Sequence, residues 1–159
     1  QKLLKEKHNI NSKFLYHPFF EFEVNNKKKT QAVSISRVDF DKHTDIILKA
    51  NKKLWNFDIV GANIPIQYTE YDAIYKGHYD WHVDIGNTNN SKRKISITIQ
   101  LSTPEDYQGG NLTFFNKPNA SRDIGSMTIF PSYLLHKVEP ILYGTRKCIV
   151  LWLCGPPFR

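Results

Sequence analysis

The stretch KISITIQLS, residues 94–102, decides the fold class because its apolar and polar side chains alternate without a break. In an extended chain, successive side chains point to opposite faces. Four aliphatic residues therefore share one face and four polar residues share the other: Ile95, Ile97, Ile99 and Leu101 against Ser96, Thr98, Gln100 and Ser102. This pattern predicts a β-strand with one apolar and one polar face.

A second strand is predicted near the end of the chain, in RKCIVLWLC, residues 146–154. Ile149, Leu151 and Leu153 would face one side, and Cys148, Val150 and Trp152 the other. Both faces are mostly apolar, so we expect other layers to cover this strand on both sides. Arg146 begins the second row, and a buried cation in such a place requires an anionic partner.

The rest of the chain is predicted to be mainly β. Asp41 opens one helical pattern, DKHTDIILKANKKLW, in which Ile46, Ile47, Ala50 and Leu54 recur at helical spacing. Further strands are expected over residues 32–40, 63–71, 77–86, 111–115, 125–131 and 133–140, with turns over 104–110 and 141–144. Short strands following one helix predict a β-sandwich or small barrel with the helix covering an outer face.

The length of 159 residues fits a single domain. We expect residues 1–61 to be a variable N-terminal part that includes the helix, and residues 62–157 to be the core. The composition, 40% hydrophobic and 23% charged, is that of a folded globule and not of a disordered chain. Cys148 and Cys154 lie too far apart along one strand for a disulfide, so both are expected to be buried thiols.

Charge and hydropathy bear on location and partners. No apolar run is long enough to span a bilayer, and the opening residues QKLLKEKHNINSK have no hydrophobic centre, so we expect neither a membrane span nor a signal peptide there. The chain starts without Met, which leaves a removed leader open. Free thiols favour a reducing, cytoplasmic compartment. The net charge of +7 includes basic runs at residues 27–29 and 92–94, which we interpret as solvated loops.

The stretch GHYDWHVDIG, residues 77–86, carries the chemistry. His78, Asp80, His82 and Asp84 occupy alternate positions, so a regular strand would place all four on one face. The stretch thus contains the pattern H-x-D twice. His136, between two hydrophobic strands, could add a third ligand. Two histidines and one carboxylate on one metal face are the ligand set of non-haem Fe(II) oxygenases.

These residues, in order and spacing, resemble a known family. YDAIYKGHYDWHVD, ISITIQLSTPEDYQGGNLTFF, FPSYLLHKVEP and GTRKCIVLWLCGPP are similar to segments of 2-oxoglutarate- and Fe(II)-dependent oxygenases, in particular prolyl 4-hydroxylase-like enzymes of the PKHD-type hydroxylase group. The resemblance covers roughly residues 62–157. It implies a double-stranded β-helix, that is, a jelly-roll or cupin-like core, with the N-terminal helix packed outside.

The resemblance also chooses between the two H-x-D pairs. The family pattern has a Tyr three residues before the metal histidine, and Tyr79 stands three before His82. Asp84 also precedes Gly86 and a polar loop, where a carboxylate at a strand end can turn toward an ion. His78 and Asp80 are then expected to be a hydrogen-bonded or surface pair, and His8, His17 and His43 surface residues.

The implied roles follow from the match. His82, Asp84 and His136 would bind Fe(II), and Arg146 would hold the distal carboxylate of 2-oxoglutarate. Six further residues are expected to line or close that pocket: Tyr71, Tyr79, Gln100, Leu112, Val138 and Trp152. Some relatives have a Tyr at the Gln100 position, so the match is imperfect there. The co-substrates would be 2-oxoglutarate and O2, with ascorbate (vitamin C) as a candidate reductant.

The resemblance implies hydroxylation of a C–H bond, with succinate and CO2 as co-products, on a peptide or protein substrate and a residue such as proline. One alternative is an alkylation-repair-type nucleic-acid demethylase, which the basic charge invites. Those relatives carry a second Arg six residues after the first, where this chain has Trp152. Another is a non-catalytic β-barrel that binds zinc or a ligand with the same residues. A purely structural domain leaves the His/Asp face without a purpose.

Overall fold

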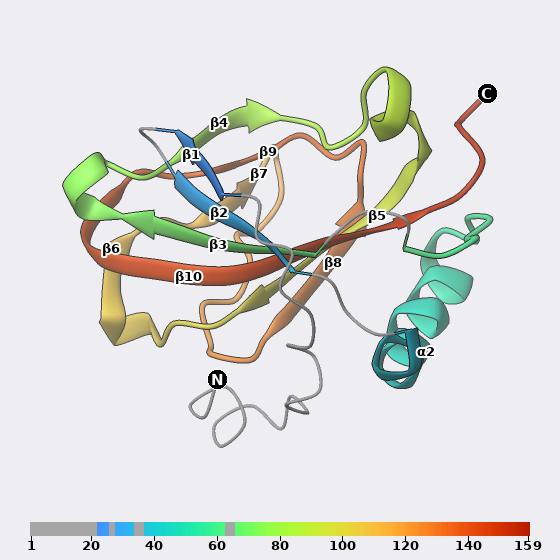
Figure 1. Ribbon diagram of the computed structural model, residues 1–159, viewed down its shortest axis with the longest axis horizontal. Helices are drawn as coiled ribbons and strands as arrows, with labels where there is room; N and C mark the ends of the chain where they lie inside the picture. Colours follow the sequence, from blue (N-terminus) through green and yellow to red (C-terminus); the bar gives the residue numbers. More distant parts are fainter. Residues whose placement is uncertain (1–21, 26–27, 34–36, 63–65) are drawn as a thin grey trace.

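The computed structural model describes residues 22–25, 28–33, 37–62 and 66–159, with side chains from residue 45 onward except at Asn89. His8 and His17, and the side chain of His43, lie outside this description, so the expectation for them stays a prediction. The described residues form ten β-strands, one long helix and three short 3-10 helices (Figure 1).

The larger sheet has seven antiparallel strands. Its main path runs in the order β1–β2–β3–β10–β5–β8, and β6 also pairs with β10. The bounds are β1 Phe22–Asn25, β2 Lys28–Val33, β3 Ile66–Asp72, β5 Arg93–Gln100, β6 Tyr107–Gly109, β8 Met127–Pro131 and β10 Ile141–Cys154. The long β10 crosses the middle of this sheet, red in Figure 1.

The smaller sheet has three antiparallel strands in the order β4–β9–β7. They are β4 Tyr79–His82, β7 Leu112–Phe114 and β9 His136–Val138. The 3-10 helices η2 Ala73–Tyr75, η3 Thr88–Lys92 and η4 Pro104–Asp106 stand at the connections between strands. Two antiparallel sheets with a shared interior are the jelly-roll architecture that the resemblance implies, so the predicted fold class is confirmed.

The two faces of the larger sheet bury different sets of side chains. Helix α2, Arg37–Leu54, contributes Ile47 to an outer apolar cluster with Ile66, Ile95, Ile97, Leu151 and Leu153. The inner cluster consists of Tyr71, Tyr107, Leu112, Phe114, Phe130, Val138, Ile141 and Cys148. The predicted division of β10 into two covered faces is therefore confirmed, and so is the position of the helix outside the sheet.

Several expected elements differ from the observed ones. The strand expected over 32–40 is wrong in its second half, because α2 already begins at Arg37. The turn expected over 141–144 is part of β10, which pairs there with β6 through an irregular register. Part of the expected turn 104–110 is β6 itself.

The basic run at residues 92–94 is not a solvated loop throughout. Lys92 is exposed, but Arg93 is half-buried and Lys94 is buried, because β5 already begins at Arg93. The other run is also partly extended, with Lys28 and Lys29 in β2. Both cysteines are buried and form no disulfide with each other, as predicted. Within the described residues, no helix combines the length and the apolar character needed to cross a membrane.

Candidate active site

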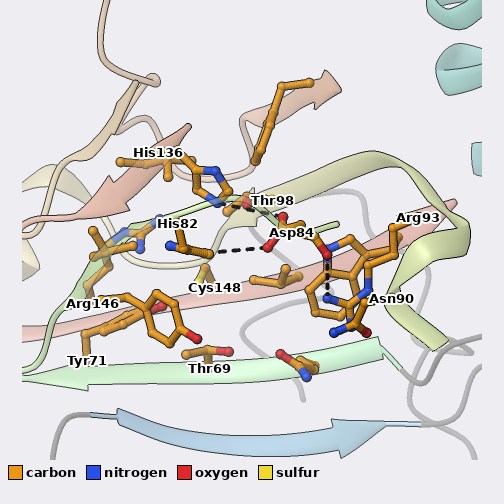
Figure 2. Close-up of a pocket in the computed structure, with 17 residues that line it drawn as sticks. Thr69, Tyr71, His82, Asp84, Asn90, Arg93, Thr98, His136, Arg146 and Cys148 are labelled. Atoms are coloured by element: carbon orange, nitrogen blue, oxygen red, sulfur yellow. Dashed lines mark hydrogen bonds and ion pairs between the residues drawn. The ribbon is translucent and has the colours of Figure 1, made fainter. Parts of the chain in front are cut away.

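A cavity of about 300 Å³ lies between the two sheets and is lined from both. The smaller sheet and the loop after β4 provide Tyr79, His82, Asp84, Leu112, His136 and Val138. The larger sheet and its neighbouring loop provide Gln67, Thr69, Tyr71, Asn90, Arg93, Thr98, Phe130, Arg146, Cys148, Val150 and Trp152. Figure 2 shows most of these side chains pointing into one space.

The pairing of β4 with β9 brings two histidines together. His82 is the direct cross-strand partner of His136, and the centroids of their imidazole rings are 4.2 Å apart. The register of this pair shifts between Tyr79 and His82, which is a β-bulge or a similar irregularity. Tyr79 and His82 are three residues apart, yet both line the cavity because this irregularity changes the alternation of faces.

The same irregularity corrects the expectation that four alternating residues share one face. Asp80 is 83% exposed, whereas the Asp84 side chain is only 9% exposed. His78 Nε2 lies 4.0 Å from Asp80 Oδ2, and His78 Nδ1 lies 2.7 Å from the Lys76 carbonyl oxygen. His78 and Asp80 therefore form a surface pair outside the cavity.

Asp84 is held in place by its backbone and by a buried hydroxyl. Its N–H donates to the carbonyl oxygen of Ser132 at 2.8 Å. Its Oδ2 accepts a 2.6 Å hydrogen bond from Ser96 Oγ, which also lies 2.9 Å from Ser132 Oγ. Ser96 and Ser132 are both fully buried. The carboxylate thus has a fixed orientation with one oxygen toward each histidine.

The three side chains present their ligand atoms to a common point. His82 Nε2 is 3.5 Å from Asp84 Oδ1, and His136 Nε2 is 3.7 Å from Asp84 Oδ2 (Figure 2). All three ligand atoms lie within 4.8 Å of one another, and no other described group of three or more His, Cys, Asp or Glu residues could hold a metal ion in this way.

Hydrogen bonds to the backbone select the tautomer of both histidines. His82 Nδ1 is 2.7 Å from the Asp80 carbonyl oxygen, and His136 Nδ1 is 2.7 Å from that of Leu134. A carbonyl can only accept, so each Nδ1 carries the proton and each Nε2 keeps a lone pair. This is the second-shell arrangement of metal-binding histidines. The donor set fits a divalent iron ion with open positions.

The electrostatics of the cluster favour the forms that bind a metal. Burial raises the pKa of Asp84, but His82, His136, Ser96 and Trp152 outweigh it and lower that pKa to about 2. Burial is also the main reason that the pKa of His136 falls below its usual value, although Asp84 opposes it. At neutral pH the cluster therefore holds a carboxylate and a neutral imidazole, as metal binding requires.

Arg146 supplies a buried positive charge to the cavity wall. It comes from β10, is 4% exposed, and lies with its guanidinium carbon 5.6 Å from the centre of the Tyr71 ring. None of the ion pairs among the described residues involves Arg146. A buried guanidinium without a carboxylate partner is suited to bind an anionic ligand.

The structure places most of the predicted lining residues around the cavity, namely Tyr71, Tyr79, Leu112, Val138 and Trp152. Gln100 is different. It is 3% exposed and does not line the cavity, because its side chain lies behind Arg146 and accepts a 3.1 Å hydrogen bond from Arg146 Nε.

Arg93 and Asn90 are lining residues that the sequence did not single out. In Figure 2 they lie on one side of the three ligand residues, and Arg146 and Tyr71 lie on the other. Arg93 stacks on Trp152, with its guanidinium carbon 3.7 Å from the ring centroid. Arg93 stands between two lysines, and the sequence analysis therefore interpreted it as part of a basic surface loop. The only signal was its place at the start of an alternating strand.

Comparison with known proteins identifies the family. The family model of the 2OG-Fe(II) oxygenase superfamily matches residues 66–154, which include all three ligand residues and Arg146. The chain belongs to this superfamily. Membership implies Fe(II) as the metal, with 2-oxoglutarate and O2 as co-substrates, and the donor set described above fits that ion. The family that the sequence resembles is thus confirmed.

The curated relatives carry a consistent name. The chain is 33% identical over 139 residues to a PKHD-type hydroxylase of Herminiimonas arsenicoxydans, and 36% identical over 141 residues to one of Janthinobacterium. In each case the match covers 80% of this chain and 60% of the relative. The chain therefore spans about three fifths of the length of these relatives.

Solved structures show the same fold. One is a prolyl hydroxylase from Trichoplax adhaerens in complex with a hypoxia inducible factor peptide, with a TM-score of 0.65, 21% identity and coverage of 83% of this chain and 66% of that one. Another is a viral collagen prolyl hydroxylase of Paramecium bursaria Chlorella virus-1, with a TM-score of 0.62, 17% identity and coverage of 82% and 81%. At 17–21% identity, these two matches show that the fold is shared.

Proposed function

We propose that this chain is an Fe(II)- and 2-oxoglutarate-dependent hydroxylase that acts on a C–H bond of a peptidyl residue such as proline. The observation that carries the proposal is the convergence of His82, Asp84 and His136 in one cavity with Arg146, a cation that forms no ion pair with the described residues. Bound Fe(II), with 2-oxoglutarate and O2, supplies oxidative decarboxylation to succinate and CO2 and transfer of one oxygen atom to the substrate.

In this proposal His82, Asp84 and His136 are the iron ligands. Their role is to fix two neutral imidazoles and one carboxylate on one side of the ion and to leave the other side toward the cavity. Ser96 holds the carboxylate through its hydroxyl, and the carbonyls of Asp80 and Leu134 hold the two rings. These groups come from β4, from β5 and from the turn between β8 and β9, so the ligands are oriented before any ion binds.

Arg146 has the role of binding the distal carboxylate of 2-oxoglutarate. Its guanidinium can donate two parallel hydrogen bonds to a carboxylate, and its burial strengthens that contact. Tyr71, Leu112 and Val138 line the cavity and exclude water from the carbon chain of the co-substrate. Ascorbate as a reductant stays a prediction.

Two buried donors favour a ligand that offers hydrogen-bond acceptors, and a peptide substrate meets this requirement. Arg93 Nε and the indole Nε1 of Trp152 are buried, and neither makes a hydrogen bond with the described residues. Trp152 Nε1 lies near enough to Asp84 to affect the pKa of that carboxyl, but without hydrogen-bonding geometry. Unsatisfied buried donors are costly, so a ligand that offers acceptors is favoured here. Backbone carbonyl groups of a peptide are such acceptors.

The second candidate is demethylation of nucleic acid, and the net charge of +7 is the observation that favours it. The position six residues after Arg146 argues against it, because Trp152 stands there with its ring stacked on Arg93. We therefore rank it below peptide hydroxylation. We also infer a reducing compartment, such as the cytoplasm, because Cys148 and Cys154 are buried and form no disulfide with each other.

The test is succinate release from Fe(II), 2-oxoglutarate and O2 with a panel of proline-rich peptides and methylated oligonucleotides. We expect a proline-containing peptide to stimulate succinate release and to gain the mass of one oxygen atom. Asp84→Ala should abolish both signals, and His78→Ala should keep both. Stimulation by a methylated oligonucleotide alone, with loss of its methyl group, would contradict the proposed substrate. Tight zinc binding with no succinate from any substrate would contradict the proposed reaction.

A further inference from the structure

We propose that Gln100 and Tyr107 are positioning residues that aim Arg146 at the co-substrate while leaving its charge uncompensated. This inference rests on the proposed function of Arg146 in binding 2-oxoglutarate. Gln100 and Tyr107 are each 3% exposed, and neither lines the cavity that Arg146 faces. They therefore act through Arg146 and do not touch the ligand.

The hydrogen bonds form a chain with only one consistent direction. Arg146 Nε donates to Gln100 Oε1 at 3.1 Å, and Gln100 Nε2 donates to the Tyr107 hydroxyl oxygen at 2.9 Å. Arginine has no acceptor atom, so the amide of Gln100 must point its oxygen toward Arg146 and its nitrogen toward Tyr107. Gln100 Nε2 also lies 3.3 Å from the Ser102 carbonyl oxygen, which fixes the same orientation.

Tyr107 is itself held by a second arginine. The guanidinium carbon of Arg122 lies 4.2 Å from the centre of the Tyr107 ring. Arg122 donates four hydrogen bonds within this region, to the carbonyl oxygens of Pro104, Tyr107 and Gly109 and to Asn111 Oδ1. This connection makes the far end of the chain rigid, so that Gln100 has a fixed partner.

The backbone on both sides of Arg146 is fixed to the same region. Ser102 Oγ donates to the Thr145 carbonyl oxygen at 3.2 Å and accepts from the Lys147 N–H at 2.8 Å. Gly144 lies opposite Tyr107 in the β6–β10 pairing, with a positive φ of 71°. Both the main chain and the side chain of Arg146 are thus positioned from the end of β5 and from β6.

The neutral character of Gln100 is the important chemical feature. A carboxylate in its place would form a buried ion pair with Arg146 and would compete with the anionic co-substrate. An amide gives the guanidinium an acceptor without cancelling its charge. An apolar residue would leave Arg146 Nε without a partner and free to rotate. The amide oxygen is thus the group that satisfies both requirements.

The experiment measures binding of two 2-oxo acids to the Mn(II)-loaded full chain by calorimetry. 2-Oxoglutarate carries a distal carboxylate, and 2-oxobutyrate does not. We expect Gln100→Leu to weaken 2-oxoglutarate binding by about tenfold, which corresponds to the free energy of about one hydrogen bond. Tyr107→Phe should weaken it by less. Gln100→Glu, which is nearly isosteric, should weaken it further. Binding of 2-oxobutyrate should stay within about twofold in all three variants.

A double-mutant cycle separates positioning from a general structural role. In an Arg146→Met background, which removes the charge, Gln100→Leu should cause no further loss of 2-oxoglutarate affinity. Equal weakening of both acids, or additive losses in the double variant, would overturn the positioning role. Unchanged 2-oxoglutarate affinity in Gln100→Glu would overturn it as well, and this variant retains the size and shape needed to fold. If Arg146→Met alone has no effect, the proposed function of Arg146 is the part that fails.

Discussion

His82 and His136 are direct cross-strand partners, although 54 positions separate them in the chain, and their imidazole centroids lie 4.2 Å apart. Strand pairing of β4 with β9 alone therefore builds two thirds of the proposed iron site. Asp84 completes it from the loop that follows β4, where Ser96 and the Ser132 carbonyl hold it. The three ligands thus come from β4, β9 and the loop after β4, and the groups that orient them come from β4, β5 and the β8–β9 turn.

Removal of the Ser96 hydroxyl is predicted to weaken metal binding. The 2.6 Å hydrogen bond from Ser96 Oγ orients the Asp84 carboxylate, and loss of such a partner typically costs about 10- to 100-fold in metal affinity. We expect Ser96→Ala to show this loss in a Mn(II) titration of the metal-free protein. Ser121→Ala, an exposed serine whose hydroxyl contacts Asp123, is the control and should bind Mn(II) normally. Equal affinities in both variants would argue against this role of Ser96.

Replacement of Arg146 is predicted to affect the co-substrate and not the metal. Arg146→Ala removes the charge, and we expect the 2-oxoglutarate requirement to rise by about 100-fold or more, as for loss of a buried, hydrogen-bonded charge. Arg146→Lys keeps the charge but lacks the planar guanidinium that donates two parallel hydrogen bonds, so a smaller rise, about tenfold, is expected. The measurement is the KM for 2-oxoglutarate in succinate release, with Mn(II) affinity as the control. A parallel loss of metal affinity would mean that the change disturbs the whole site.

Stability should fall at alkaline pH because of Tyr71. Burial is the main cause that raises the pKa of this 6% exposed phenol above its ordinary value of 10. The folded form keeps the proton while the unfolded form loses it above pH 10. Stability from this group is therefore complete below pH 10 and declines above it, by about 1.4 kcal/mol per pH unit.

Urea unfolding at a series of pH values checks this prediction. Tyr71→Phe should lessen the decline above pH 10, because Phe cannot ionise. Tyr133→Phe, at a 47% exposed position, is the control and should leave the slope as in the wild type. The same slope in Tyr71→Phe as in the wild type would assign the decline to other groups, of which the half-buried Tyr68, with its raised pKa, is the first to consider.

Gly144 is predicted to be essential for the approach of β6 to β10. It has a φ of 71°, and a Cβ atom there would collide with the carbonyl oxygen of Asp106. We expect Gly144→Ala to lower the free energy of unfolding by about 2–4 kcal/mol, since strain and a backbone clash add. Gly86→Ala is the matched control, because a Cβ there meets only the Asn90 Cβ at 3.7 Å. Equal stability of the two variants in urea unfolding would contradict this explanation.

The sequence predicted the central strands well because their two faces meet uniform layers. In β5 and β10 the aliphatic row packs in the cluster that includes Ile47 of α2, and the other row lies on the inner side of the sheet, where Thr98 and four residues of β10 line the cavity. Each row therefore keeps its alternation. The same reasoning failed at residues 37–40, where a short alternating run belongs to a helix, and at 141–144, where Gly144 lies within a strand and does not end it. A glycine signals a positive φ, but not whether a turn or a β-bulge uses it.

The site was only partly readable from the residues. Alternation suggested one face for four side chains, and the irregularity between Tyr79 and His82 separates Asp80 from the cavity. Such a bulge depends on the partner strand, so β4 alone cannot reveal it. The resemblance to the oxygenase family selected His82 and Asp84 where periodicity could not. Gln100 was expected beside the co-substrate, but the structure places it behind Arg146, because its amide has both an arginine and a tyrosine to satisfy.

The most direct test of the proposed iron site is an anaerobic titration of the full chain with Fe(II). Binding is measured by calorimetry in the wild type and in four alanine variants. We predict one Fe(II) per chain for the wild type and for His78→Ala. His82→Ala, Asp84→Ala and His136→Ala should lose this binding, by about 10²-fold or more, while each metal-free variant unfolds cooperatively. Loss of iron binding in His78→Ala with normal binding in His82→Ala would contradict the assignment of His82, Asp84 and His136 as the iron ligands. Undiminished binding in His136→Ala would contradict it as well.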